Sequence, residues 1–306
     1  MELYLAPMEG ITTYTYRNTH AELFGECDGY YAPFIVPTDN EKLSMKTLRD
    51  IKPEHNLVKP KIQVMCSTWS AFGEFVQKVK EIGYDEVNLN FGCPSGTVVK
   101  KFRGSGALKN PDALDEMLYH IFDKTDIKIS IKTRAGFYSH EEFDKLLKIY
   151  AKYPLSKLIV HPRVREEYYR GEPNLESFQK AYNLFPNNLC YNGNIYSVEN
   201  YHNICEKFPG IDSVMIGRGC VRNPAIFREI KGGKKLSTAE LIHFSNLLEK
   251  RYYELFRSEC NTLHKLKEIW MHMIENYPNE PKIMKAVKKS GKLIELNSAI
   301  QALPEL

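Results

Sequence analysis

A cysteine at position 93 stands between a glycine and a proline, directly after the short alternating segment Val87–Phe91. Glycine permits unusual backbone angles and proline fixes one of them, so the backbone determines where this thiol lies. Three basic residues follow in the next loop: Lys100, Lys101 and Arg103. Together these residues indicate a reactive thiol beside an anionic substrate that the basic loop contacts.

The other cysteines offer no comparable chemistry. The chain holds 7 cysteines in 306 residues, without a C-x-x-C pair or a Cys/His cluster of zinc spacing, so we expect no metal site. The first residues, Met1–Met8, lack the basic and apolar regions of a signal peptide, and no apolar run reaches membrane-spanning length. We therefore expect a soluble cytoplasmic protein with reduced thiols and no membrane association.

The net charge of +4 is unevenly distributed. Residues 231–306 contain 13 Lys and Arg against 9 Asp and Glu, a difference of +4, whereas residues 1–230 contain 29 of each. The basic excess would suit an appendage that faces a polyanion. A merely solvated helical surface accounts for the same charge equally well.

Eight strand-like segments recur along the first 230 residues, and most are separated by segments of helical periodicity. This order predicts a parallel sheet, and its size is typical of a (β/α)8 TIM barrel. A doubly wound open sheet is disfavoured because the glycine-rich turn after the first strand is missing. The expected strands are Leu3–Ala6, Gly29–Pro33, Lys61–Met65, Glu86–Asn90, Ile127–Lys132, Lys157–His161, Asn188–Tyr191 and Ser213–Ile216.

The chain changes character after Arg228. Lys231–Lys235 reads as a linker, and Ser237–Glu240 is a capping box that begins a helix. We predict two domains, a catalytic barrel at 1–230 and a small all-helical domain at 231–306. Within the barrel, Pro33–Pro60 is expected to be a long loop with one short helix.

Four lysines near the C-terminus follow helical spacing. A helix would place them on one face, with Val287 and Ile294 on the opposite side. Like charges at this spacing repel one another, which an anion would relieve. An anion-binding face is therefore favoured over a merely solvated one for Lys285, Lys288, Lys289 and Lys292.

In a barrel, the groups that act on a ligand lie at the C-terminal ends of the strands. Lys132 would place an ammonium against a ring that carries negative charge, and Gln63 offers a donor and an acceptor to the edge of a heterocycle. Glycine turns at Gly193 and at Gly217–Gly219, with Arg218, would bind a phosphate. Phosphate and ring together indicate flavin mononucleotide (FMN), and a phosphosugar is the alternative.

Beside a reduced flavin, Cys93 is better interpreted as an acid than as a nucleophile. When a hydride reaches one carbon of an activated double bond, a proton must reach its neighbour, and a neutral thiol can donate it. A hydrolase is disfavoured because no base is placed near Cys93 by the sequence. A redox disulfide lacks a partner cysteine.

The sequence resembles the tRNA-dihydrouridine synthases over essentially its whole length, including the helical C-terminal part. The most specific element is Asn90–Pro94 (NFGCP) with the basic loop after it. The segments that carry the resemblance are Ala6–Gly10 (APMEG), Asn88–Ser95 (NLNFGCPS), Gly104–Leu108 (GSGAL), Lys132–Arg134 (KTR), Asn192–Gly193 (NG) and Met215–Gly219 (MIGRG).

This resemblance implies reduction of a uridine C5–C6 bond in RNA, in particular tRNA, with FMN in the barrel mouth and NADPH as reductant. Cys93 would protonate C5 while the flavin N5 supplies a hydride to C6, and Asn90 would help to place the uracil. The base must leave its stack to reach the flavin. The resemblance assigns FMN binding to Pro7, Met8, Glu9, Gln63, Lys132, His161, Asn192, Gly193, Asn194, Gly217 and Arg218.

Two positions depart from the family pattern. Pro162 follows His161 where a small residue is expected, so the loop with Arg163 and Arg165 could run differently. Asn194 stands where an acidic residue is common. Two other functions stay open: an FMN barrel that acts on a free small molecule, similar to dihydroorotate dehydrogenase, and a catalytically silent RNA-binding protein. No obligate protein partner is evident from the sequence.

Overall fold

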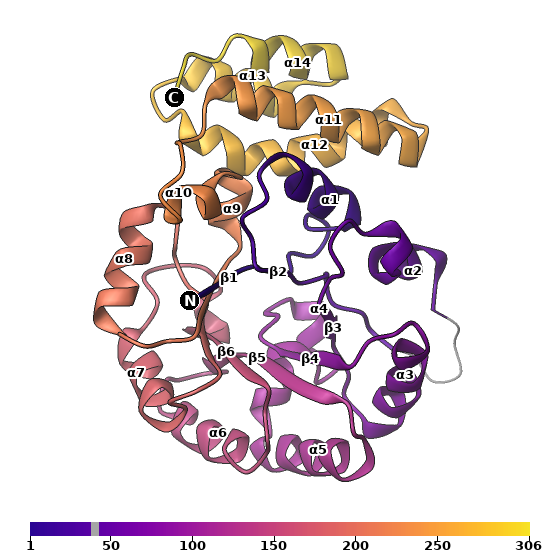
Figure 1. Cartoon of the computed structure of the whole chain (residues 1–306), viewed down its shortest axis with the longest axis vertical. Coiled ribbons are helices and arrows are strands. Elements are labelled where there is room, and N and C mark those ends of the chain that lie inside the picture. The colour runs from indigo at the N-terminus through magenta and orange to yellow at the C-terminus, as the bar shows by residue number, and fades with distance from the viewer. Residues whose placement is uncertain (38–42) are drawn as a thin grey trace.

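A computed structural model describes residues 1–37 and 43–306 of the chain (Figure 1). Its centre is one sheet of eight parallel strands. Each strand overlaps a segment that the sequence predicted to be a strand. The strands are β1 Glu2–Leu5, β2 Gly29–Tyr30, β3 Ile62–Val64, β4 Glu86–Phe91, β5 Lys128–Gly136, β6 Lys157–Val164, β7 Leu189–Tyr191 and β8 Ser213–Ile216.

The sheet curls into a closed barrel. Its strand order is β2-β1-β8-β7-β6-β5-β4-β3, and the two edges meet through parallel bridges from Tyr31 to Lys61 and from Ile35 to Val64. The predicted (β/α)8 barrel is thereby confirmed. Closure leaves no free sheet edge and turns alternate side chains of every strand into one interior.

Helices cover the outside of the barrel and pack their apolar faces on it. In α3, Phe72, Phe75, Val76 and Val79 are all buried, as the helical period of the sequence predicted. None of the helices in the described ranges has the length and apolar character needed to cross a membrane. The outer helices are α1 Tyr14–Leu23, α2 Met45–Ile51, α3 Trp69–Glu81, α5 Pro111–Lys124, α6 Glu142–Tyr150, α7 Leu175–Leu184 and α8 Val198–Lys207. The short α4 Gly96–Val99 belongs to the loop that follows β4.

The loop predicted at Pro33–Pro60 contains α2 and a short 3-10 helix, Pro53–His55. Residues 38–42 of that prediction lie outside the described residues. Arg17 of α1 ties this segment to the barrel, since its guanidinium donates to the backbone oxygen of Thr12 at 2.6 Å and to the side chain of Asn56 at 2.8 Å. The segment is thus anchored on the β1 side of the barrel.

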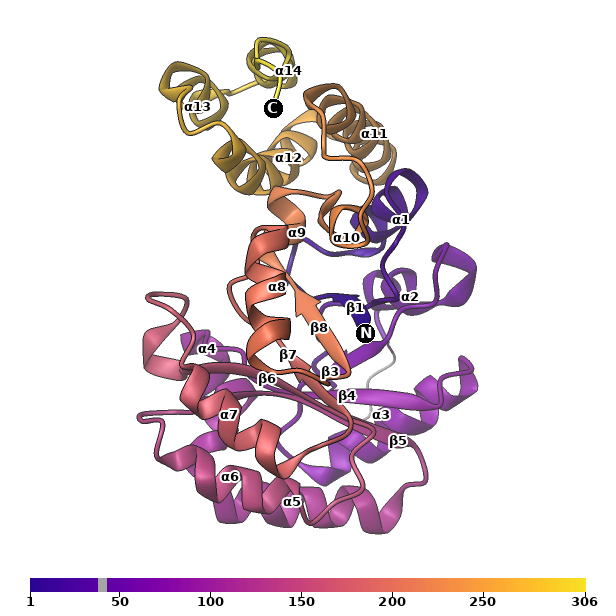
Figure 2. The same cartoon turned by 60° about the vertical axis from the view of Figure 1, so that its left-hand side comes forward.

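The remaining helices lie together at one end of the molecule (Figures 1 and 2). The predicted capping box opens α11, because Ser237 accepts from the N–H of Glu240 and the Glu240 carboxylate accepts from the N–H of Ser237. Phe244 of α11 packs edge-on against Tyr16 and Phe24 of α1. These helices are α9 Arg218–Arg222, α10 Ile226–Ile230, α11 Thr238–Phe256, α12 Glu259–Met273, α13 Pro281–Lys289 and α14 Leu293–Gln301.

The predicted single helix with four lysines on one face is wrong. α13 ends at Lys289, and Lys292 is the residue that precedes α14. The buried Ser290 adopts an extended conformation there, and its hydroxyl donates to the carbonyl of Val287 at 2.9 Å. Ile294 is 71% exposed and does not share the buried position of Val287. All four lysines are nevertheless exposed.

Candidate active site

Register and alternation place polar side chains inside the C-terminal end of the barrel. Asn90 of β4 is the register partner of Lys132 of β5, and Arg134 of β5 is the partner of His161 of β6. Alternate positions of a strand share one face, so Asn90, Lys132, Arg134 and His161 all face the interior. Below them, Ile159, Cys190 and Met215 fill the barrel with apolar side chains.

These side chains surround a cavity of about 420 Å³. Its walls come from the ends of most strands and from α12 of the C-terminal helices. The lining residues are Ala6, Pro7, Met8, Glu9, Phe34, Asn90, Gly92, Cys93, Lys132, Arg134, His161, Tyr169, Asn192, Gly193, Gly217, Arg218 and His272. Most of the predicted site residues therefore meet at one place.

Five predicted residues lie outside the lining of this cavity. Gln63 is fully buried behind Asn90, so its contact with a cofactor stays a prediction. Asn194 lies behind the lining, where its side chain donates a hydrogen bond to Glu172 and accepts one from Arg218. Lys100, Lys101 and Arg103 belong to the loop between Cys93 and α5; the first two are exposed and the third is half-buried.

The carboxamide of Asn90 holds the loop that carries Cys93. Its Oδ1 accepts hydrogen bonds from the backbone N–H of Gly92 at 2.9 Å and of Cys93 at 3.0 Å. Its Nδ2 donates to Oε1 of Gln63 at 2.7 Å. Gln63 donates in turn to Asn88 at 2.8 Å, and Asn88 to Ser130 at 3.0 Å. The backbone around Cys93 is thus anchored in a buried network that crosses three strands.

The turn at Gly104–Gly106 packs against Cys93. The backbone N–H and the hydroxyl of Ser105 both donate to the carbonyl oxygen of Cys93, at 3.1 and 2.8 Å. Gly104 has a φ of +55°, and a Cβ on it would lie 2.9 Å from the Cβ of Cys93. Only glycine fits both the backbone angle and the space, which explains the glycine at this position.

The environment keeps the Cys93 thiol protonated. Burial raises its pKa, and the nearby Glu9 carboxylate raises it further, against the opposing effects of Arg134 and Lys132. A thiol with a raised pKa is a weak nucleophile at neutral pH, but it can donate a proton.

Lys132 is a buried cation that lines the cavity. Burial and the neighbouring Arg134 lower its pKa to about 8. Within residues 1–37 and 43–306 it forms no ion pair, and its side chain lines the cavity. An ammonium in this position is costly unless an anion enters the cavity.

His161 is neutral and its tautomer is set by its neighbours. Burial and the charges of Arg134 and Lys132 hold its pKa well below the usual value. Nδ1 lies 2.7 Å from the carbonyl oxygen of Asn192, so it carries the proton, and Nε2 accepts from Arg163 at 3.3 Å. The strand continues through Pro162 to Val164, and Arg163 turns back to donate to the carbonyl of Arg170 at 3.2 Å.

Gly193 and Arg218 form the opposite wall. A Cβ on Gly193 would lie 2.1 Å from the hydroxyl of Tyr191, so no larger residue fits. Within the described chain, the backbone N–H groups of Gly193 and Asn194 donate no hydrogen bond. The Arg218 guanidinium donates to Oδ1 of Asn194 at 3.1 Å. This wall offers free N–H groups beside a fixed cation, which is the chemistry of a phosphate site.

Comparison with known proteins agrees with this geometry. The sequence model of the family described as "Dihydrouridine synthase (Dus)" matches residues 4–302. The chain belongs to this family. A probable tRNA-dihydrouridine synthase of Staphylococcus aureus (strain Mu50) is 26% identical over 276 residues, which span 87% of this chain and 82% of that protein. tRNA-dihydrouridine synthase B of Vibrio vulnificus (strain CMCP6) is 28% identical over 235 residues, 75% of this chain and 70% of that protein.

Solved structures share the architecture more distantly. Morphinone reductase has a TM-score of 0.51 with 10% identity, over 76% of this chain and 86% of that chain. Identity this low shows a common barrel fold alone. The predicted resemblance to dihydrouridine synthases is confirmed by the family match, which makes the chain a member of an oxidoreductase family.

Six lining residues were missing from the predicted site, and two of them, Ala6 and Gly92, flank predicted ones. Arg134 was recognised at its strand end without a role; its Nε donates to the carbonyl of Gly92 at 2.8 Å and fixes the Cys93 loop from below. Phe34 and Tyr169 come from loops after β2 and β6, where no periodic pattern marks a position. His272 comes from α12, and burial lowers its pKa. Only the three-dimensional structure relates this helical segment to the barrel mouth.

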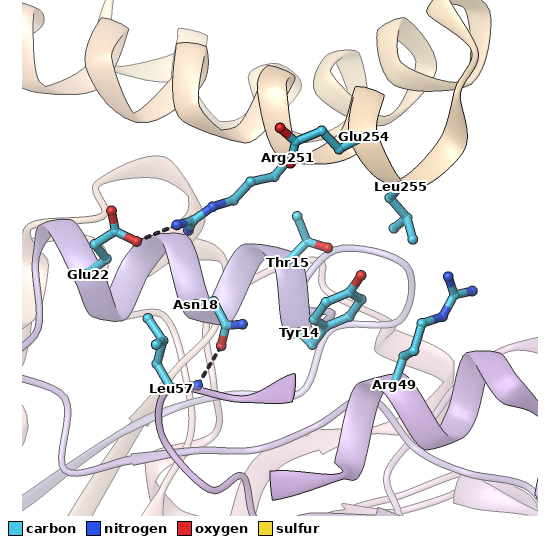
Figure 3. A pocket seen from close by; sticks show the side chains of 9 residues that line it. All are labelled: Tyr14, Thr15, Asn18, Glu22, Arg49, Leu57, Arg251, Glu254 and Leu255. Carbon is cyan, nitrogen blue, oxygen red and sulfur yellow. Dashed lines mark hydrogen bonds and ion pairs between the residues drawn. The ribbon is translucent and has the colours of Figure 1, made fainter. Parts of the chain in front are cut away.

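A second cavity, of about 460 Å³, lies between α1, α2 and α11 (Figure 3). Arg251 of α11 reaches down to the carboxylate of Glu22, and Asn18 accepts from the N–H of Leu57 at 3.0 Å. None of the predicted site residues lines it. Its polar contacts attach α11 to α1, which fixes the C-terminal helices against the barrel.

Proposed function

We propose that this protein reduces uridine to 5,6-dihydrouridine in tRNA, with FMN as its cofactor and NADPH as reductant. The observation that carries the proposal is that Cys93 and Lys132 line one cavity at the C-terminal end of a barrel of the dihydrouridine synthase family. A proton donor and a cation that line one cavity match the two halves of a reduction, which needs a proton and a site for a negatively charged ring.

The lining residues fit a flavin mononucleotide. Lys132 provides the cation that a flavin ring with negative charge needs, and Arg218 with the N–H groups at Gly193 and Asn194 suits its phosphate. Pro7 and Met8 line the same cavity and supply apolar contact. The bound flavin would supply the hydride to C6 of the uracil.

Cys93 would give the proton to C5. Its raised pKa keeps the proton on sulfur until the uracil accepts it. The backbone of Cys93 donates to Asn90 and accepts from Ser105, which fixes the residue that carries the thiol. Asn90 then acts mainly as a positioning residue, because both ends of its carboxamide are engaged by protein atoms.

The substrate would approach from the side where the helical residues 231–306 meet the barrel. We propose that these residues form an RNA-binding domain on the catalytic barrel of residues 1–230. Their basic excess, the lysines of α13 and the exposed Lys100 and Lys101 would contact phosphates. We place the reaction in the cytoplasm, whose reducing conditions suit the seven free cysteines.

A reconstituted assay tests this proposal. The purified protein is incubated with FMN, NADPH and an unmodified tRNA transcript, and the nucleosides are analysed by mass spectrometry for a gain of two hydrogens. Free uridine and orotate serve as parallel substrates. Reduction of the transcript alone supports the proposal, whereas turnover of a free pyrimidine alone would replace it with a small-molecule reductase.

A further inference from the structure

Two aromatic residues at the barrel mouth have a backbone conformation that suits glycine. Phe102 has a φ of +52° and Tyr168 a φ of +53°. Bulky residues rarely adopt positive φ, because their Cβ then crowds the carbonyl oxygen. Strained backbone of this kind is held in place by the surrounding structure and is concentrated at functional sites.

The fold does not account for these side chains. Phe102 follows α4 at a position where a helix usually has glycine, and its N–H donates to the carbonyl of Val99 at 3.1 Å. Its ring is 62% exposed, and it forms no aromatic contact among the described residues. Tyr168 is 38% exposed. Both rings therefore face solvent, although burial would have stabilised the fold.

Both residues are joined to the loop of the catalytic thiol. Phe102 lies two positions before Gly104, which packs against Cys93. Tyr168 stacks under the guanidinium of Arg165 at 4.7 Å, and Nε of Arg165 donates to the carbonyl oxygen of Pro94 at 3.3 Å. The two rings thus belong to loops that meet at Cys93 and Pro94, next to the cavity.

Cations accompany the rings. Lys100 and Lys101 are exposed beside Phe102. Next to Tyr168, the ring of Tyr169 lies between two guanidinium groups, 5.3 Å from Arg134 and 4.8 Å from Arg218. Exposed aromatic faces among basic residues are the arrangement with which proteins bind unstacked bases of single-stranded RNA.

We infer that Phe102 and Tyr168 are stacking sites for the RNA bases on either side of the uridine that enters the cavity. The inference rests on the proposed function, because turning the uridine out of its stack exposes the faces of its two neighbours. Both residues are exposed, so a base can cover each ring. The adenine of the nicotinamide cofactor is the competing occupant.

The test uses substitutions to glycine, which relieve the strain. Phe102→Gly and Tyr168→Gly are each expected to raise the melting temperature and to weaken binding of an unmodified tRNA transcript by about tenfold. The slope of affinity against salt stays unchanged, because no phosphate contact is lost. By contrast, Lys100→Gln with Lys101→Gln lowers that slope. Phe102→Trp restores affinity and Phe102→Leu does not.

The controls separate the possible failures. Tyr119→Ala removes an exposed aromatic ring from α5, away from the mouth, and is expected to leave RNA binding unchanged. Wild-type affinity in both glycine variants, with an active wild-type enzyme, would overturn the stacking sites. Slower flavin reduction by NADPH in these variants, with normal RNA binding, would also overturn them in favour of the cofactor. A wild-type protein that reduces no RNA would contradict the proposed function itself.

Discussion

The backbone N–H of Cys93 donates a hydrogen bond to the side-chain oxygen of Asn90 at 3.0 Å. Asn90 is the last inward-facing residue of β4 before the loop, and its other end donates to the buried Gln63. The thiol is therefore positioned from inside the barrel, through a network that continues to Asn88 and Ser130. The loop that carries Cys93 is therefore held in place by the strands below it.

Asn90→Ala removes the acceptor for two backbone N–H groups. We expect dihydrouridine formation to fall by about 100-fold, since small misplacement of a reacting group has effects of this size, while flavin binding is retained. Asn90→Asp keeps the acceptor for the two N–H groups but sets a carboxylate oxygen against Oε1 of Gln63, so we expect an intermediate loss. Single-turnover rates with prereduced enzyme provide the measurement. Equal rates for Asn90→Ala and the wild type would contradict the positioning role.

Lys132→Met should stabilise the folded protein and weaken its binding of FMN. The lysine loses its proton near pH 8 in the folded protein, and at its usual pKa of 10.5 when unfolded. Between pH 8 and pH 10.5, unfolding therefore takes up a proton. Below pH 8 the folded protein bears the full free-energy cost of burying the charged lysine. At pH 7 the variant without cofactor should be more stable by roughly 1–3 kcal/mol. This gain should fade as the pH approaches 10.5.

The same variant should bind FMN at least tenfold more weakly, measured by flavin fluorescence. Lys148→Met on the exposed face of α6 is the matched control, with both properties unchanged. Unaltered FMN affinity in Lys132→Met would show that the cavity cation does not serve the flavin.

The Cys93 thiol should react slowly with alkylating reagents at neutral pH. Its raised pKa leaves little thiolate, so its rate of modification by iodoacetamide should lie well below that of the exposed Cys260. The proton-donor role also requires activity to decline only when the pH rises above the usual range of a thiol. Rapid modification of Cys93 at pH 7, located by peptide mass spectrometry, would contradict a neutral thiol.

The lysines of α13 should contribute to RNA affinity through phosphate contacts. Changing Lys285, Lys288 and Lys289 together to Gln should weaken tRNA binding and reduce its salt slope by about 2–3, with NADPH-driven flavin reduction unchanged. The control changes Lys145, Lys148 and Lys180 on α6 and α7, which removes equal charge from the far side of the barrel. Equal losses in both triple variants would indicate a nonspecific effect of charge.

Much of the barrel could be predicted because burial imposes a regular pattern on each strand and helix. Asn90, Lys132 and His161 line the cavity as inward-facing residues of β4 to β6, although β5 and β6 continue beyond their predicted ends to Gly136 and Val164. The alternation of side chains along a strand could not show that Gln63 turns towards Asn90 and Asn88, because hydrogen-bond partners depend on side-chain directions in neighbouring strands.

Other features escaped prediction because they depend on tertiary contacts. The helix through Lys292 ends early because Ser290 is buried, and its carbonyl accepts from Lys267 of α12 at 2.7 Å. Tyr169 and His272 reach the cavity from an irregular loop and from a helix distant in sequence, so no local spacing marks them.

The central claim is that this chain forms dihydrouridine in RNA with Cys93 as the acid. The most direct test maps dihydrouridine in the RNA of cells that lack the protein and of cells complemented with wild type or Cys93→Ala. We predict that defined tRNA positions lose dihydrouridine, that the wild type restores them, and that Cys93→Ala binds FMN yet restores almost none. Unchanged dihydrouridine in the deletion strain, or full restoration by Cys93→Ala, would contradict the account.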